Sequence, residues 1–503
     1  MDLQLLVEGL LTTLTPGNLA LVFAGMLIGV FFGSLPGISS SMGIVLMLPF
    51  TYYMGILPSI ILLVALYAGS AYGGSITAIL FNTPGTPEAV ATTFDGYPMA
   101  KQGKAGRALS LAISASAFGG IFSVLIMLFL APPLSSVALK IQSAEYFALT
   151  VLGLMVISSI GTKSPVKAIT SGLIGIMIAM IGMDPIVGAD RFTFGNIELM
   201  NGLEMIPIMI GAFALAEVLN QVTERQVNLD MTKKVSLETI KLYELIKHKW
   251  VLLKSAVIGT VIGILPGTGG SIASIVSYGE AMRSSKNKEN FGQGEEEGIL
   301  APETANNAAA GGAMIPTLVL GIPGSPTTAI ILAALALQGL QPGPQLMTDQ
   351  PLMLYCIFFS MLIASVAVFI GGRLGVKAFA AILKLPYSVL GTLIVLLSMV
   401  GSYAVGNSMF NVWIMLLFGV FGYFMKKYHF SPASMVLGLV LGPMMEENFR
   451  RHLLVTSGDY LSFITQPISG VILLFSALTL LYPVIAKFIN KRKPVTPDEK
   501  KAV

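Results

Sequence analysis

Long apolar segments with almost no charged residues recur along the whole chain of 503 residues. Many approach the roughly 20 residues that an α-helix needs to cross the hydrocarbon core of a bilayer. Charged residues make up only 11% of the chain and apolar residues 54%, so a soluble fold could not hide this apolar surface. The apolar runs are continuous rather than alternating, which disfavours a transmembrane β-barrel. The sequence therefore predicts an all-α polytopic membrane protein, and it excludes soluble enzymes and nucleic-acid-binding proteins.

The apolar segments predict roughly 10 to 14 membrane elements. In the first half of the chain they fall near 18–34, 41–66, 106–131, 144–161, 165–183 and 203–220. In the second half they fall near 251–265, 313–339, 351–370, 386–404, 408–425 and 461–486, with less regular pieces near 271–282, 374–384 and 432–444.

Basic residues cluster in a central linker and in the C-terminal tail. Because positively charged loops stay in the cytoplasm, we place both inside the cell. The resulting division is a first membrane repeat over 1–220, a basic cytoplasmic linker over 221–254, a second membrane repeat over 255–486 and a basic tail over 487–503. The N-terminus has no basic region ahead of a short apolar core, so we expect no cleaved signal peptide.

Two proline-glycine interruptions occur in the same order in both halves of the chain. Leu35-Pro36-Gly37 recurs as Leu265-Pro266-Gly267, and Thr83-Pro84-Gly85 recurs as Ile322-Pro323-Gly324. A glycine pair precedes the later interruption in each half, Gly73-Gly74 and Gly311-Gly312, and the second half has one residue inserted between the pair and the interruption. These landmarks predict two structural repeats, each with two broken or re-entrant helical hairpins. The repeats are inverted if each half crosses the membrane an odd number of times. Accidental recurrence of Leu-Pro-Gly is the alternative, and the shared register counts against it.

Broken helices survive in a membrane only where protein buries them or where they line a wet cavity. A helix that resumes after a break presents free N–H groups and the positive end of its dipole, which suits an anion. Carbonyl groups freed at the breaks can bind Na⁺, and paired interruptions are typical of secondary transporters. The competing interpretation is that glycines only allow close helix packing, and we favour it for Gly25, Gly29 and Gly33.

We expect the substrate-binding residues to lie at the four breaks and beside them: Pro36, Gly37, Ser39, Ser40, Gly73, Gly74, Asn82, Thr83, Pro84, Gly85, Thr86, Pro266, Gly267, Thr268, Gly269, Asn306, Asn307, Gly311, Gly312, Pro323, Gly324 and Ser325. Carbonyl groups near Gly37, Gly85, Gly267 and Gly324 are the expected Na⁺ ligands.

Polar residues near the breaks leave alternatives open. Asn306 and Asn307 either contact a ligand or ion or cap a helix. We interpret Glu88 and Asp95 as parts of a solvated loop, and Glu204 and Glu217 as interfacial residues. No intramembrane lysine or arginine stands out as a substrate clamp, so anion binding would rest mainly on backbone N–H groups and hydroxyls.

Several catalytic motifs are absent from the sequence. It contains no phosphate-binding loop of the form G-x-x-x-x-G-K-[ST], no H-E-x-x-H and no G-x-S-x-G. Its single cysteine, Cys356, excludes a disulfide framework. We therefore expect neither an enzyme nor a cofactor, apart from a coupling ion.

The interruptions and their neighbours resemble the large permease subunit (TctA) of tripartite tricarboxylate transporters. The resemblance covers essentially the whole chain and rests on 33–37, 72–76, 82–87, 94–98, 263–267, 302–307, 310–312 and 321–325. It implies a multi-pass protein of the bacterial cytoplasmic (inner) membrane. It further implies two partners, a small membrane subunit and a periplasmic solute-binding protein. Transport in such systems is driven by an ion gradient, typically of Na⁺, and the substrates are carboxylates such as citrate.

Together these features predict secondary active uptake of a tricarboxylate or related organic carboxylate, with alternating access and an elevator-type movement. The alternatives are an anion channel built from the same half-helices and a stand-alone carboxylate transporter. A membrane-embedded enzyme and a purely structural subunit fit the sequence less well.

Overall fold

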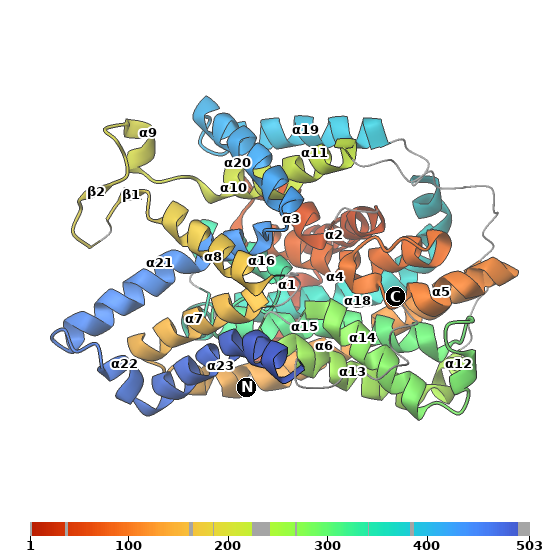
Figure 1. Cartoon of the computed structure of the whole chain (residues 1–503). Helices are drawn as coiled ribbons and strands as arrows, with labels where there is room; N and C mark the ends of the chain where they lie inside the picture. Colours follow the sequence, from red (N-terminus) through yellow and green to blue (C-terminus); the bar gives the residue numbers. More distant parts are fainter. Residues whose placement is uncertain are drawn as a thin grey trace. The chain divides into compact units, whose positions relative to one another are not determined.

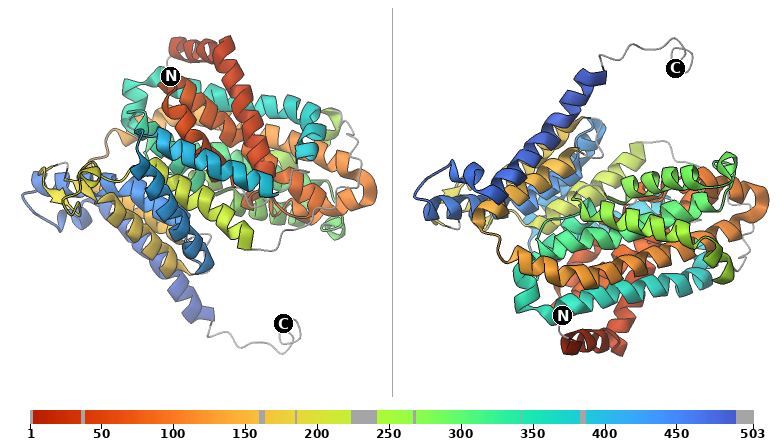
Figure 2. Two further views of the ribbon diagram at one scale, coloured as in Figure 1. Left: turned by 90° about the horizontal axis from the view of Figure 1, so that it is seen from above. Right: turned by 90° about the horizontal axis from the view of Figure 1, so that it is seen from below.

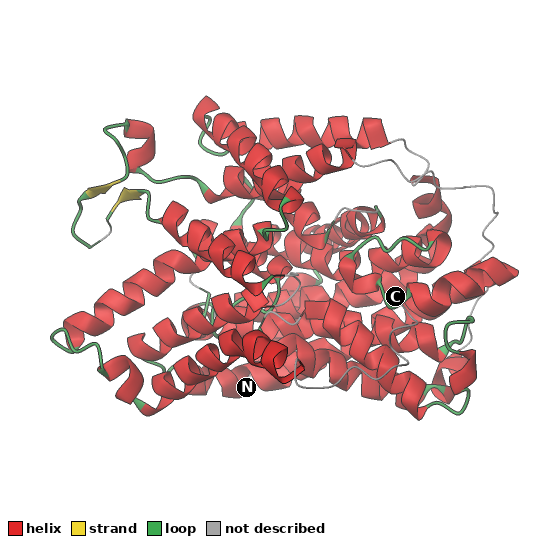
Figure 3. Cartoon of the chain, in the orientation of Figure 1, coloured by secondary structure: helices red, strands yellow, loops and turns green. Residues whose placement is uncertain are grey.

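The computed structural model describes residues 3–35, 39–159, 164–184, 186–223, 242–266, 269–340, 342–382 and 387–490. Helices dominate these residues, and one short sheet, in which β1 (Gly182–Met183) pairs antiparallel with β2 (Asp190–Arg191), occurs among them (Figure 3). The described part of the chain contains six helices that are long and apolar enough to cross a membrane: Pro16–Ser34, Ile56–Phe81, Thr93–Ser136, Met205–Thr223, Pro351–Gly372 and Met409–Lys427. The chain is therefore an all-α multi-pass membrane protein, as predicted.

The chain divides into two compact units, neither of which is continuous in sequence (Figure 1). The first unit comprises Met1–Lys140 and Met180–Tyr428. Its elements up to residue 140 are α1 (Leu3–Thr13), α2 (Pro16–Ser34), α3 (Ser40–Tyr52), α4 (Ile56–Phe81), η1 (Pro87–Ala89), α5 (Thr93–Met99), η2 (Ala100–Lys104) and α6 (Ala105–Ala138). After residue 180, in addition to the sheet, come α9 (Ile197–Met200), α10 (Met205–Met209), η3 (Ile210–Leu215), α11 (Ala216–Thr223), α12 (Leu242–Lys247), α13 (Lys249–Ile264), α14 (Gly269–Ser284), η4 (Lys288–Asn290), α15 (Glu297–Val319), α16 (Pro326–Leu337), α17 (Pro344–Asp349), α18 (Pro351–Ile382), α19 (Tyr387–Ala404) and α20 (Met409–Lys427).

The second unit comprises Ile141–Ala179 and His429–Val503. Its helices are α7 (Ser143–Ser159), α8 (Pro165–Ala179), α21 (Pro432–Val455), α22 (Ser462–Thr465) and α23 (Pro467–Asn490). α8 and α21 approach so closely that a Cβ added at Gly438 would lie 2.0 Å from the carbonyl oxygen of Gly172. Aromatic rings join α7 to the region around α22, since the centroids of Phe147 and Phe463 are 5.0 Å apart.

All four predicted interruptions end helices in the first unit. α2 ends at Ser34 and α13 at Ile264, each just before Leu-Pro-Gly. α4 ends at Phe81 and α15 at Val319, before the two later breaks. Asn82 and Gly321, which follow these two ends, have positive φ angles of 55° and 70°. The prediction of broken helices is confirmed, because proline removes a backbone donor and a left-handed residue turns the chain out of the helix.

Glycines of α2 let it pack directly against the backbone of α4. A Cβ added at Gly29 would lie 2.1 Å from the carbonyl oxygen of Leu66, and one added at Gly33 would lie 2.4 Å from that of Ser70. Gly25 meets Leu62 in the same way at 2.4 Å. The packing interpretation of this glycine row is therefore confirmed.

α13 and α15 pack in the same manner in the other half of the chain. A Cβ added at Gly259 would lie 2.3 Å from the carbonyl oxygen of Ala305, and one at Gly263 would lie 2.4 Å from that of Ala309. Because the register advances by four residues on both helices, α13 and α15 run parallel, as α2 and α4 do.

The long helix α6 lies between α15 and α18, and the right-hand view of Figure 2 shows these helices side by side in orange, green and teal. α6 and α18 run antiparallel. A Cβ added at Gly120 would lie 2.4 Å from the Ser365 hydroxyl, and one added at Gly372 would lie 3.1 Å from Ile113.

The basic linker and the basic tail fall largely outside the described residues, in 224–241 and 491–503. The predicted boundaries at 220, 254 and 486 stay a prediction.

Candidate functional site

Two half-helices of the first unit lie side by side with their N-termini at the same end. The hydroxyl of Ser41, near the start of α3, is 3.0 Å from that of Thr327, near the start of α16. At the other end of the pair, the Gln338 amide of α16 donates to the carbonyl of Thr51 in α3, at 2.9 Å. Since the residue numbers of both helices rise from the first contact to the second, the two helices are parallel. Their positive dipole ends therefore lie at the same end of the pair.

Serine side chains cap both N-termini. The Ser39 hydroxyl accepts from the backbone N–H of Met42 at 3.3 Å, and the Ser325 hydroxyl accepts from that of Thr328 at 3.2 Å. Thr328 completes a capping box, because its own hydroxyl accepts from the Ser325 N–H at 2.9 Å. Each cap satisfies one of the free N–H groups in the first turn and leaves others to meet an anion.

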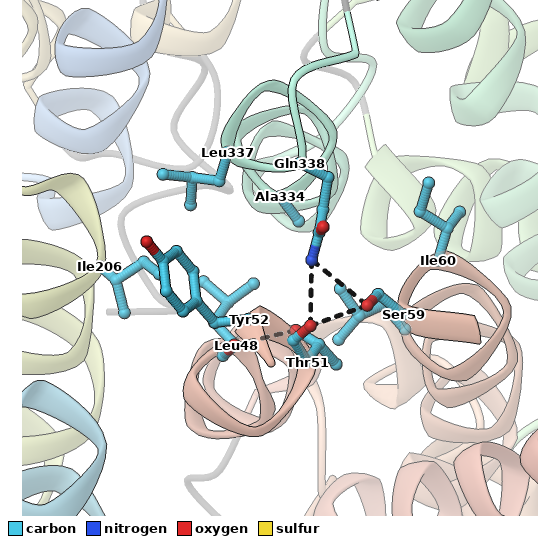
Figure 4. A pocket seen from close by; sticks show the side chains of 10 residues that line it. Leu48, Thr51, Tyr52, Ser59, Ile60, Ile206, Ala334, Leu337 and Gln338 are labelled. Carbon is cyan, nitrogen blue, oxygen red and sulfur yellow. Dashed lines mark hydrogen bonds between the residues drawn. The ribbon is translucent and has the colours of Figure 1, made fainter. Parts of the chain in front are cut away.

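The opposite ends of these helices meet at a small structural joint. Gln338 points toward Thr51 and Ser59, and its amide also donates to the Ser59 hydroxyl at 3.2 Å (Figure 4). The cavity beside it measures about 10 Å³. That volume is close to the minimum for one water molecule, so the joint fixes α16 against the α3–α4 turn rather than holding a substrate.

A larger cavity, of about 330 Å³, opens at the N-terminus of α3. Small-molecule pockets start at roughly 300 Å³, so this cavity is of ligand size. It is lined by Ser39, Met42, Pro84, Gly85, Thr86, Pro87, Phe213, Glu217 and Lys426. Predicted site residues from the first break region and from the later break of the same half thus line one cavity, which also includes residues that the sequence did not indicate.

A lysine–glutamate ion pair lines this cavity. Lys426, in the last turn of α20, pairs with the carboxylate of Glu217, in the first turn of α11. The other carboxylate oxygen of Glu217 accepts from the Gln221 amide at 3.1 Å. Sequence reasoning missed Lys426, because a lysine at the end of an apolar helix is usually an interfacial anchor.

Two buried threonine hydroxyls lie at the later break of the first half. The Thr77 hydroxyl has no hydrogen-bond partner among the described residues, and the Thr86 hydroxyl interacts there with the Glu88 carboxylate alone. A Cβ added at Gly85 would lie 2.1 Å from the carbonyl oxygen of Gly33 and 2.9 Å from the Thr77 hydroxyl. A Cβ added at Gly74 would lie 2.4 Å from the Thr86 hydroxyl. The Gly33 carbonyl and the Thr77 hydroxyl therefore both lie close to Gly85, and uncharged oxygens of this kind can bind a hard cation.

The corresponding break of the second half is satisfied internally. The Gly324 N–H donates to the Thr317 hydroxyl at 3.2 Å, and the Ile322 N–H donates to the Pro316 carbonyl at 3.2 Å. A cation site therefore fits the break at Gly85 better than the break at Gly324.

The two asparagines of α15 have different partners. The Asn306 amide donates across to the Ala71 carbonyl of α4 at 3.0 Å, whereas the Asn307 amide donates to the Glu303 carbonyl of its own helix at 3.0 Å. Asn306 thus ties α15 to α4 beside α14, since its side-chain oxygen would lie 2.4 Å from a Cβ at Gly270.

The glycine pairs lie at helix contacts. A Cβ added at Gly73 or Gly312 would meet the carbonyl oxygen of Val30 or Thr260, and one at Gly311 would meet the Ser123 hydroxyl.

The remaining predicted site residues are distributed around these breaks. Thr83 donates its N–H to the Thr77 carbonyl at 3.4 Å, and Ser40 and Pro323 are buried. Pro266 follows the end of α13, and Gly269 begins α14 with a φ of 61°. Outside the described residues lie Pro36, Gly37, Gly267 and Thr268.

The interpretation of Asp95 as a solvated residue is wrong. Its carboxylate is fully buried and accepts from the N–H groups of Gly294 and Glu295, both at 2.8 Å, and from the Tyr278 hydroxyl at 2.9 Å. Asp95 therefore holds the loop before α15. The lysines near Asp95 in the sequence suggested a solvent-exposed loop. The contacts of Asp95 with a distant loop leave no signal in the sequence.

A second buried carboxylate, Glu303, lies inside α15. Its oxygens accept from the Thr92 hydroxyl at 2.5 Å and from the Ser116 hydroxyl at 2.9 Å. Glu303 belongs to the segment 302–307 on which the resemblance rests, but sequence analysis assigned it no role. In the structure it joins α15 to α6.

Comparison with known proteins gives one family match and two similar proteins. Residues 19–437 match the model of the tripartite tricarboxylate transporter TctA family. An uncharacterized 52.8 kDa protein in the TAR-I ttuC′ 3′ region of Agrobacterium vitis is 36% identical over 491 residues, which cover 98% of both chains. An uncharacterized protein in the TAR-II ttuC′ 3′ region of the same organism is 37% identical over 241 residues, 48% of this chain and 100% of the relative. No solved structure matches the chain.

Proposed function

The chain belongs to the tripartite tricarboxylate transporter TctA family, and from that premise we propose that it takes up a tricarboxylate or related organic carboxylate across the cytoplasmic membrane. It acts as the large permease subunit, with a small membrane subunit and a periplasmic solute-binding protein as partners. An inward Na⁺ gradient drives the uptake.

The observation that carries the proposal is the pair of parallel half-helices α3 and α16. Their N-termini meet at the Ser41–Thr327 contact, beside the cavity of about 330 Å³. Each helix end is equivalent to roughly half a positive charge and offers free N–H groups, so the pair attracts a carboxylate without a dedicated arginine. An apolar setting strengthens this attraction, because the surroundings screen charge less than water does.

The proposed coupling site lies at the later break of the first half. The carbonyl of Gly33 and the hydroxyls of Thr77 and Thr86 are its ligands, and Thr86 also lines the larger cavity. Because a cation there would stand close to the bound carboxylate, each ligand would strengthen the binding of the other, as ion-coupled transport requires.

Inverted repeats are part of the proposal, and two features support them. Gly29 and Gly33 meet carbonyls of α4 in the way that Gly259 and Gly263 meet carbonyls of α15. In both halves a later glycine packs back against the first helix, Gly73 on Val30 and Gly312 on Thr260. This pairing aligns Gly73 with Gly312 rather than with Gly311, so no inserted residue is needed between this glycine and the later break of either half.

The antiparallel contact of α6 with α18 supports inversion. Each follows the later break of one half, so we treat them as equivalent helices. Two equivalent helices that run antiparallel are related by a two-fold axis perpendicular to their length. In a membrane that axis lies in the plane of the bilayer and inverts one half relative to the other.

The experiment is uptake of labelled citrate into vesicles that contain the full chain with its small subunit and binding protein. Uptake that requires both an inward Na⁺ gradient and the binding protein supports the proposal. Rapid citrate leak that needs no gradient would instead favour a channel, and gradient-driven uptake by the chain alone would favour a stand-alone transporter.

A further inference from the structure

The ion pair of Lys426 with Glu217 lies beside a cavity, a place where a salt bridge with a purely structural role is not needed. Both residues line the cavity at the N-terminus of α3, together with Ser39 and Thr86. Their side chains keep only 28% and 11% of their surface exposed. Desolvation makes such pairs costly relative to apolar residues, so their presence beside a cavity calls for a functional reason.

The charges around the cavity suit a molecule with more than one carboxylate. The α3 N-terminus contributes the positive end of a helix dipole, and Lys426, from α20, contributes a full positive charge. Glu217 neutralises the lysine while the cavity holds no anion, and its second oxygen is already bound by the Gln221 amide at 3.1 Å. That amide can keep the carboxylate of Glu217 in place when the lysine turns away from it.

We propose that Lys426 binds a carboxylate of the substrate and that Glu217 is the counter-ion which the substrate displaces. The inference rests on the proposed function and names its substrate class, a molecule with at least two carboxylates. One carboxylate takes the place of Glu217 on Lys426 and another meets the N–H groups at the start of α3. A monocarboxylate can satisfy only one of these positions and therefore binds more weakly.

The test measures citrate, succinate and acetate binding to the purified full chain, together with uptake in vesicles that contain its partners. Lys426→Met should weaken citrate binding and raise the KM for uptake by about tenfold or more, since it removes a charge partner from a partly desolvated site. Lys426→Arg should keep most of the affinity. Glu217→Gln should tighten citrate binding, because the competing carboxylate is gone.

The matched control is the adjacent Lys427, whose ammonium lies 5.9 Å from the centroid of the Tyr423 ring. Lys427→Met should leave citrate affinity unchanged. The double variant Lys426→Glu with Glu217→Lys, the exchanged pair, distinguishes a role in binding from a role in structure. It can restore an ion pair, but a carboxylate replaces the lysine on α20, so citrate affinity should stay low.

The outcomes separate the two proposals. Unchanged citrate affinity in Lys426→Met, full affinity in the exchanged pair, or equal affinity for citrate and acetate would overturn the role of Lys426. Binding that depends on Lys426 without any uptake by the complete system would overturn the transport proposal and leave the binding site standing. Failure of the wild-type chain to bind either citrate or succinate would overturn the binding site itself.

Discussion

The hydroxyl of Ser41 lies 3.0 Å from that of Thr327, although the residues come from opposite halves of the chain. The contact brings together the first interruption of one half and the later interruption of the other. It sets two capped helix N-termini side by side, and that of α3 lines the cavity of about 330 Å³.

Removing the caps should impair substrate binding more than folding. Replacing an N-cap serine by alanine costs about 1 kcal/mol of helix stability, which a protein of this size can absorb. We expect Ser39→Ala and Ser325→Ala each to reduce citrate uptake severalfold through a raised KM, with a normal amount of folded protein.

The control for the cap variants is Ser408, which caps α20 by accepting from the Phe410 N–H at 3.1 Å. Ser408→Ala should lower stability by a similar amount and leave the KM unchanged. Equal effects of all three substitutions on the KM would refute a specific role for the α3 and α16 caps.

The hydroxyls of Thr77 and Thr86 should set the Na⁺ dependence of uptake. Thr77→Val and Thr86→Val each remove one proposed ligand, and the Thr77 hydroxyl makes no hydrogen bond among the described residues. We expect the Na⁺ concentration for half-maximal uptake to rise by about tenfold, the equivalent of roughly 1.4 kcal/mol, with no loss of thermal stability.

Thr317 offers the opposite case, because its hydroxyl already accepts from the Gly324 N–H and donates to the Ala313 carbonyl. Thr317→Val should lower the unfolding temperature and leave the Na⁺ dependence as it was. If Thr77→Val and Thr86→Val behave like Thr317→Val, the cation does not bind at Gly85.

Close packing at Gly29 and Gly259 should tolerate no added methyl group. A Cβ at these positions would lie 2.1 Å and 2.3 Å from backbone carbonyl oxygens. Overpacking of this kind costs about 1–3 kcal/mol, so both Gly→Ala variants should unfold at lower temperature. Gly279 of α14 has no atom within 4 Å of an added Cβ, and its alanine variant should unfold like the wild type. Matching losses at Gly29 and Gly259 are the expected signature of equivalent positions, and a tolerant site at either would argue against that equivalence.

A cluster of charged side chains around His248, the residue before α13, should make the stability of the protein depend on pH. The His248 ring lies 3.5 Å from Glu296 and 3.4 Å from Glu297, and Arg107 also binds Glu296 at 2.6 Å. These carboxylates raise the pKa of His248 to about 9 through hydrogen bonds, first with Glu296 and then with Glu297. The hydrogen bond from His248, followed by that from Arg107, lowers the pKa of Glu296 to about 2.

The sign of the pH effect follows from these directions. His248 contributes its full stabilisation below its usual pKa of 6.5, and the contribution is lost as the pH rises through about 9. Glu296 contributes above its usual pKa of 4.5, and its contribution is lost as the pH falls through about 2. The difference in unfolding temperature between wild type and His248→Asn should therefore be large at about pH 6 and small at about pH 10. A difference in unfolding temperature that stays constant over this range would contradict a stabilising role of the charged cluster around His248.

The sequence predicted the helix interruptions because their signals are local. Proline and glycine act on their own backbone, so the ends of α2, α4, α13 and α15 could be placed without knowledge of the fold. The same holds for the glycine row of α2, whose spacing by itself indicates one flat helix face.

The residues that sequence reasoning missed depend on contacts between distant segments. The sequence around Lys426 indicates an interfacial lysine, and only the fold shows that Glu217 and the cavity lie beside it. Asp95 reads as solvated until the loop at Gly294 covers it. Thr77 lies within an apolar helix and gives no signal, because only the arrangement around Gly85 shows that its hydroxyl lacks a partner.

A structure of the complete transporter with bound citrate would test the central claim most directly. We predict citrate density in the cavity between the α3 N-terminus and Lys426, with the Lys426–Glu217 ion pair opened. Citrate bound elsewhere in the chain, with this cavity empty and the ion pair intact, would contradict the account.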